Sequence, residues 1–99
     1  MNINVTQEGA KTEFAIEGRL DTTTAPQIEE FANGLYAKGV TDIEVDMASC
    51  DFVSSAGLRV IVTMQKCAMA GGSLVFKNVM DEVMDVFKMT GFDKILTIA

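Results

Sequence analysis

The chain has 99 residues, of which 48% are hydrophobic, and its formal net charge is −6 at pH 7. This length suits one domain with its own core, so we expect a single domain over residues 1–99. The acidic balance disfavours nucleic acid and anionic membrane surfaces as partners, because both require clustered Lys and Arg. The sequence contains no His, which excludes Ser-His and Cys-His nucleophile pairs.

The N-terminus and the two cysteines argue against export and against a metal site. Residues 1–10 lack the basic start and apolar segment of a signal peptide, and every apolar run is shorter than the about 20 residues of a transmembrane helix. Cys50 and Cys67 do not form a CxxC pair, so we expect two reduced, buried thiols. The sequence therefore predicts a cytoplasmic protein with no metal and no cofactor.

The strands are predicted by alternation of apolar and polar residues. Ile3–Val5 and Phe14–Ile16 alternate in this way around a turn at residues 8–10, which indicates an antiparallel hairpin. Residues 42–47 alternate similarly and predict a third strand. Two further strands are expected at 73–76 and 95–98.

Three helices are predicted between these strands. Thr24-Ala25-Pro26-Gln27 fits a capping box that opens a helix ending at Gly39. The second helix runs from Ser55 or Ala56 to about Met69, and the third opens after Asn78 and stops at Gly91, with its apolar stripe at Val79, Val83, Val86 and Phe87.

The element order is β, β, α, β, α, β, α, β, which predicts an α/β fold with one mixed sheet. After the first hairpin, alternation of strand and helix implies parallel crossovers. Ligands of such sheets gather at the carboxyl ends of strands, so the segments of interest are 18–24 and 48–57.

Two adjacent serines, Ser54 and Ser55, lie where a strand leads into the second helix. Serine is a preferred N-cap, whose hydroxyl accepts a hydrogen bond from an otherwise unpaired N–H group. The same helix start favours an anion, so a phosphate on one of these hydroxyls would be stabilised there. The two interpretations are compatible, and both stay open at this point.

The segment Ser54-Ser55-Ala56-Gly57-Leu58 resembles the signature of STAS domains, the sulfate transporter and anti-sigma-factor antagonist group, which reads roughly Asp-Ser-Ser/Thr-Gly-Leu. Further segments resemble the family in the same order along the chain: Gly18-Arg19-Leu20-Asp21, Thr24-Ala25-Pro26, Gly71-Gly72-Ser73-Leu74 and the stretch from Phe87 to Ile95. The resemblance covers almost the whole chain and implies a single STAS-like domain.

The resemblance implies a phosphorylation switch. In the antagonist branch, the unphosphorylated protein binds an anti-sigma-factor serine kinase and releases the sigma factor, and a PP2C-type phosphatase reverses the modification. By position the phosphoserine is Ser55, with Ser54 as the alternative. The sequence departs from the family pattern at Ser54, which replaces an Asp, and at Ala56, which replaces a Ser or Thr.

The resemblance also implies a partner-binding face. We expect it to contain Asp21, Thr22, Ser54, Ser55, Gly57, Leu58 and Arg59. Asp21 has an equally good interpretation as a loop residue that binds nearby backbone N–H groups. Arg59 is the natural cation for a phosphate on Ser55 or for an acidic group of the partner.

Other classes of function remain as alternatives. A STAS subunit of another regulatory or transport complex would use Ser54 and Ser55 only to cap the helix. An enzyme is disfavoured, because no base, nucleophile and orienting group converge in the sequence. A nucleotide at the start of the second helix is left open. We therefore expect a regulatory binding protein with no catalytic residue.

Overall fold

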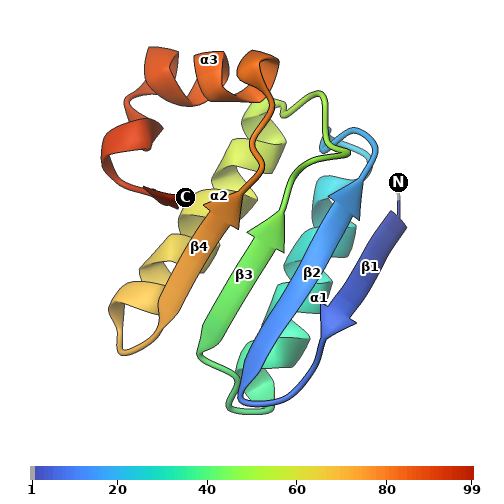
Figure 1. Cartoon of the computed structure of the whole chain (residues 1–99), viewed down its shortest axis with the longest axis vertical. Helices are drawn as coiled ribbons and strands as arrows, with labels where there is room; N and C mark the ends of the chain where they lie inside the picture. Colours follow the sequence, from blue (N-terminus) through green and yellow to red (C-terminus); the bar gives the residue numbers. More distant parts are fainter. Residues whose placement is uncertain (1) are drawn as a thin grey trace.

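The computed structural model describes residues 2–99 and contains a five-stranded mixed sheet in the order β1-β2-β3-β4-β5 (Figure 1). The strands β1 (Asn2–Gln7) and β2 (Lys11–Glu17) form an antiparallel hairpin. The strands β3 (Asp42–Asp46), β4 (Ser73–Lys77) and β5 (Thr97–Ile98) then follow in parallel, each beside its predecessor. The predicted α/β fold with an N-terminal hairpin is confirmed.

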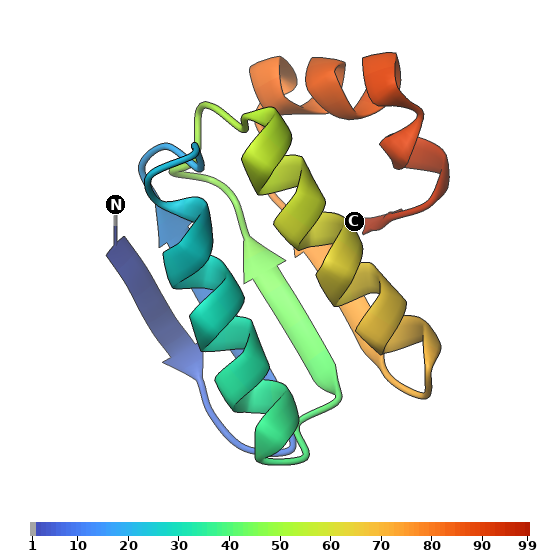
Figure 2. The same ribbon diagram turned by 180° about the vertical axis from the view of Figure 1, so that it is seen from behind.

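Helices α1 (Ala25–Ala37) and α2 (Ser55–Met69) cover one face of this sheet, as Figure 2 shows from the helix side. Helix α3 (Asp81–Thr90) lies across the end of the sheet near the carboxyl end of β4 (Figure 1). A short 3₁₀ turn, η1 (Phe92–Lys94), connects it to β5. Among the helices of residues 2–99, none is long and apolar enough to cross a membrane.

The core lies between the sheet and its two covering helices. In β2, β3 and β4 the side chains that point toward the helices are buried, which explains the alternation in the sequence. The largest buried side chains include Phe14, Ile16, Ile43, Val45 and Phe76 from strands and Ile28, Ile61 and Phe87 from helices. Phe31 of α1 packs edge-on against Phe14, with ring centroids 4.8 Å apart.

The opposite face of the sheet carries ionic contacts between strands. Lys11 pairs with Glu44 at 2.8 Å, and Lys77 pairs with Glu13 at 2.8 Å and with Glu44 at 3.7 Å. The hydrogen bond between Lys77 and Glu13 raises the pKa of the lysine and lowers the pKa of the carboxyl. The alternating acidic residues of β3 therefore belong to a polar face of the sheet.

Two expectations differ from the structure. The strand expected at 95–98 is limited to Thr97–Ile98, because the N–H groups of Ile95 and Leu96 both bond to the carbonyl of Phe92 and keep the chain wound. Cys50 is buried as predicted, but Cys67 is exposed. Cys67 lies on the flank of α2, beside the stripe that faces the sheet.

The third helix also differs in detail. It begins at Asp81 rather than directly after Asn78, which has a positive φ of 56°. Of its predicted stripe, Val83 and Phe87 are buried, whereas Val79 and Val86 are only partly buried against the core. The helix ends at Gly91 in the left-handed conformation, as predicted.

One glycine is required by a close backbone approach. A Cβ on Gly72 would lie 2.2 Å from the carbonyl oxygen of Thr41, whereas a Cβ on Gly34, inside α1, would meet nothing within 4 Å. The contact is with the Thr41 backbone, which cannot move aside as a flexible side chain can.

We expect Gly72→Ala to lower the free energy of unfolding by about 1–3 kcal/mol through overpacking. Gly34→Ala is the matched control and should raise the free energy of unfolding by about 0.5–1 kcal/mol, because alanine is a better helix former than glycine. Urea denaturation of both variants measures the difference. Changes of the same sign in both variants would contradict the close contact at Gly72.

Candidate functional site

Two loops at the carboxyl ends of β2 and β3 form one continuous surface. The first is 18–24, and the second is 47–54. Three backbone hydrogen bonds of 2.9 Å join them, from Gly18 N–H to Ser49 O, from Leu20 N–H to Phe52 O and from Ser54 N–H to Leu20 O. Leu20 and Val53 form a parallel bridge within this contact. The start of α2 is thereby fixed beside the start of α1.

Ser54 is the N-cap of α2. Its backbone is extended, and its Oγ accepts a hydrogen bond of 3.2 Å from the N–H of Gly57. Its carbonyl accepts the N–H of Leu58 at 2.9 Å. The capping role considered for both serines thus belongs to Ser54.

Ser55 is the first residue of α2, and its side chain is exposed. Its hydroxyl makes no hydrogen bond within residues 2–99. The backbone N–H groups of Ser55 and Ala56 have no acceptor in the same part of the chain, so the helix start can still receive an anion. Arg59 is also exposed and lies one turn later on the same side of α2.

Gly57 and Leu58 lie below this surface. A Cβ on Gly57 would be 2.8 Å from both Cγ and the carbonyl oxygen of Leu20. Leu58 is only 8% exposed and belongs to the core. Both residues therefore position the start of α2, and neither is presented to solvent as the other predicted partner-binding residues are.

Asp21 organises the loop before α1. Its Oδ1 accepts hydrogen bonds from the N–H groups of Thr23 and Thr24 at 3.0 and 3.2 Å. The Thr24 hydroxyl accepts the N–H of Asp21 at 2.9 Å and donates to the carbonyl of Arg19 at 2.7 Å. Because this hydroxyl is turned into the loop, the expected capping box does not form, and Gln27 N–H bonds instead to the Thr24 carbonyl.

These contacts set the charge of Asp21. Burial raises the pKa of its carboxyl, but the hydrogen bonds from Thr24 and Thr23 outweigh that effect, so the pKa is below the usual value. The carboxylate is therefore ionised at neutral pH. Its contribution to stability is present above the ordinary Asp pKa and is lost as the pH falls through the lowered value.

Two further residues, which were not predicted to belong to the site, join this surface. The guanidinium of Arg19 stacks on Phe52, with Cζ 4.3 Å from the ring centroid, and its Nε lies 3.9 Å from Oδ2 of Asp21. Phe52 is 39% exposed. Arg19 and Phe52 lie in the two segments of interest, 18–24 and 48–57, but their contact depends on the pairing of the two loops and has no sequence pattern of its own.

A shallow groove of about 150 Å³ separates the starts of α1 and α2. Thr22, Glu29 and Arg59 contribute its polar side chains, and Ala25, Pro26, Ala56 and Val60 contribute its apolar walls. The groove is smaller than the roughly 300–1,000 Å³ typical of small-molecule sites. The two predicted binding residues Thr22 and Arg59 are thus brought together beside one groove.

The fold and this site are those expected of a STAS domain. The sequence model of that family described as "Mlab, STAS domain" matches residues 3–97. The chain therefore belongs to the STAS domain family.

Similar proteins carry related names. BtrV of Bordetella bronchiseptica, assigned as an anti-sigma factor antagonist, is 31% identical over 85 residues, which cover 85% of this chain and 73% of BtrV. The anti-sigma-B factor antagonist of Staphylococcus aureus is 27% identical over 97 residues, covering 97% of this chain and 90% of that protein.

Solved structures share the fold at lower identity. A crystal structure assigned as an anti-sigma factor antagonist from Thermotoga maritima has a TM-score of 0.90 at 19% identity, covering 97% of this chain and 84% of that chain. The phosphorylated form of the Bacillus cell fate determinant SpoIIAA has a TM-score of 0.77 at 19% identity, covering 99% of this chain and 91% of that chain.

The division of roles between the serines is testable by stability. Ser54→Ala removes the cap and should lower the free energy of unfolding by about 1 kcal/mol. Ser55→Ala should change it by less than about 0.5 kcal/mol, as is usual for an exposed side chain. Chemical denaturation of the two variants decides this. A larger loss in Ser55→Ala than in Ser54→Ala would reverse the assignment.

Proposed function

We propose that this chain is an anti-sigma-factor antagonist that acts as a phosphorylation switch. In its unphosphorylated form it binds an anti-sigma factor that is also a serine kinase, and the sigma factor is released. The observation that carries this proposal is the hydroxyl of Ser55 at the first position of α2, which is exposed and does not cap the helix. The names of the relatives support the class of partner.

The binding face consists of the exposed residues around Ser55. We assign to it Phe52, Arg19, Thr22 and Arg59, with Asp21 holding the loop in place. An aromatic side chain covered by a guanidinium is a favourable centre for a protein interface, because Arg and aromatic residues are enriched at interface hot spots. The shallow groove on this face fits a folded partner better than a small molecule.

Phosphorylation would act by adding charge to this face. The kinase transfers the γ-phosphoryl group of ATP to Oγ of Ser55, the hydroxyl proton is lost, and ADP leaves. A PP2C-type phosphatase hydrolyses the phosphoserine and restores the hydroxyl. The added charge is roughly −1.5 to −2 at pH 7, and the free N–H groups of α2 and the nearby Arg59 stabilise it where it stands. The fold is preserved, and the contact with the partner is lost.

Ser54 is the less suitable acceptor. Its hydroxyl is engaged with the N–H of Gly57 at 3.2 Å, and its side chain is half-buried. A kinase would have to break the cap, which is worth about 1 kcal/mol, before transfer. The proposal therefore places the phosphate on Ser55.

We propose that this chain binds a partner and does not catalyse a reaction. We also propose that it acts in the cytoplasm. Asp21 is the carboxylate of the first loop, and it already accepts the N–H groups of Thr23 and Thr24 and contacts Arg19. It is thus a structural acceptor rather than a free general base.

A STAS subunit that does not switch is the second candidate. It is favoured by Ser54, which stands where the family has an acidic residue and caps the helix, and by Ala56, which removes a hydroxyl. In that case Ser55 would never carry phosphate. Intact-mass comparison of the protein from its own cells with protein from cells lacking the kinase separates the two candidates.

Incubation with an anti-sigma-factor kinase from the same cell and ATP should add one phosphate to Ser55. Tandem mass spectrometry locates it, and Ser55→Ala should abolish the labelling, whereas Ser49→Ala, another exposed serine on the adjoining loop, should not. Phosphate on Ser54, or undiminished labelling of Ser55→Ala, would contradict the assignment.

Binding of that kinase should survive Ser55→Ala and weaken about a hundredfold in Ser55→Asp, because the added negative charge faces a partner surface that has no group to match it. Thr97→Asp places the same charge on the edge strand β5, outside the binding face, and is the control. Isothermal titration calorimetry measures all three affinities. Equal affinity of Ser55→Ala and Ser55→Asp would exclude the switch.

A further inference from the structure

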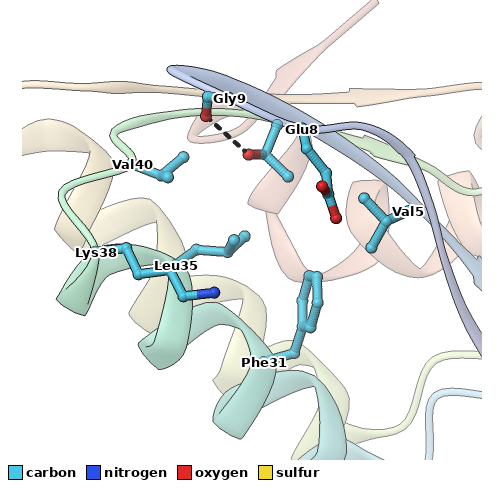
Figure 3. Close-up of a pocket in the computed structure, with 8 residues that line it drawn as sticks. Val5, Glu8, Gly9, Phe31, Leu35, Lys38 and Val40 are labelled. Atoms are coloured by element: carbon cyan, nitrogen blue, oxygen red, sulfur yellow. Dashed lines mark hydrogen bonds between the residues drawn. The ribbon is translucent and has the colours of Figure 1, made fainter.

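A continuous apolar groove runs between β1 and the adjacent flank of α1, away from the binding face. It consists of two adjoining hollows of about 310 and 410 Å³, which share Phe31, Leu35 and Lys38 in their linings. Ile3 lines the second hollow and Val5 the first. Figure 3 shows Val5 and Phe31 on opposite walls, with the side chains turned toward one another.

Strand β1 borders this groove and is the outer strand of the sheet (Figures 1 and 2). Outer strands present unpaired N–H and C=O groups, and proteins usually protect them with charged residues, proline or bulges. β1 contains neither a charged residue nor proline. Its register with β2 is regular from Asn2 to Val5, and an irregularity appears only between Val5 and Gln7.

We propose that β1 is a dimerisation edge whose occupant is β1 of a second copy of this chain. The two strands pair antiparallel about a two-fold axis at Asn4. The two five-stranded sheets then continue into one another, and the two apolar grooves close over each other. This interface uses no residue assigned to the partner-binding face and does not depend on the proposed function.

The side-chain pattern of β1 is self-complementary in this register. Residues directly opposite in an antiparallel pair point to the same face. With Asn4 opposite Asn4 of the second copy, Ile3 meets the second copy's Val5, and Val5 meets its Ile3. Both apolar side chains lie on the helix face, half-buried against the core, and the uncharged Asn4 pair lies on the polar face.

Charges on α1 complete the match. Gln27 and Glu30 line only the hollow that contains Ile3, and Val40 lines only the hollow that contains Val5. Lys38, near the end of α1, lines both. Asn4 therefore stands level with the part of α1 between Glu30 and Lys38. A two-fold axis at Asn4 runs the two α1 helices in opposite directions and brings Glu30 of each copy to the level of Lys38 of the other. The two ion pairs favour a second copy over an unrelated strand.

The strand edge is tested with Asn4→Lys. Asn4 is exposed, so the substitution leaves the core intact, but it places two like charges together on the axis. Thr97→Lys puts the same charge on the exposed position of the opposite edge strand β5 and is the control. Sedimentation equilibrium should give a dimer for the unmodified chain and for Thr97→Lys, and a monomer for Asn4→Lys.

The antiparallel orientation of the two copies is tested by exchanging the charges of Glu30 and Lys38 on α1. Glu30→Lys or Lys38→Glu alone should raise the dimer dissociation constant about tenfold, because symmetry removes both ion pairs at once. The double variant Glu30→Lys with Lys38→Glu recreates the pairs in reverse and should restore dimerisation. Asp85→Lys on α3 and Lys66→Glu on α2 are the matched controls and should leave it unchanged.

Three outcomes would overturn the proposal. One is a monomer at every concentration of the unmodified chain. Another is a dimer that persists unchanged in Asn4→Lys, which would place the contact on a different surface. The third is a double variant that dimerises no better than the single variants. Circular dichroism establishes that each variant is folded. Binding of the anti-sigma-factor kinase is measured separately and bears only on the switch.

Discussion

The functional end of this domain depends on the backbone pairing of Leu20 with the segment that leads into α2. The N–H of Leu20 donates to Phe52, its carbonyl accepts from Ser54, and its fully buried side chain fills the space beside Gly57. These contacts replace the hydrogen bonds that both loops would otherwise make with water. They also fix the direction of α2, so every residue of the binding face takes its place from this pairing.

At the start of α2, the neighbouring residues Ser54 and Ser55 have separate physical roles. Ser54 satisfies a backbone donor of α2, whereas Ser55 leaves its hydroxyl and the adjacent N–H groups accessible. A helix start built in this way can gain or lose a phosphate without losing its cap. The exposed contact of Arg19 with Phe52 adds an aromatic and cationic surface beside Ser55, where the proposed change in charge would act directly on binding.

The fold separates this face from the other surfaces of the domain. The loops lie at the carboxyl ends of the parallel strands, the ionic contacts of Lys11, Glu13, Glu44 and Lys77 lie on the polar face of the sheet, and β1 lies at one edge. A partner at the first surface leaves the edge accessible. The proposed self-association and the proposed switching therefore use different surfaces of one small domain.

The sequence by itself determined the strands, the helices and their order, because alternation and helical spacing record which side chains face the core. It also predicted a candidate site at the two serines and the loop at Asp21. Tertiary structure decided which serine caps α2, turned the Thr24 hydroxyl into its loop, shortened β5 and exposed Cys67. The contact of Arg19 with Phe52 was likewise decided there, since pairing between loops distant in the chain leaves no periodic pattern in the sequence.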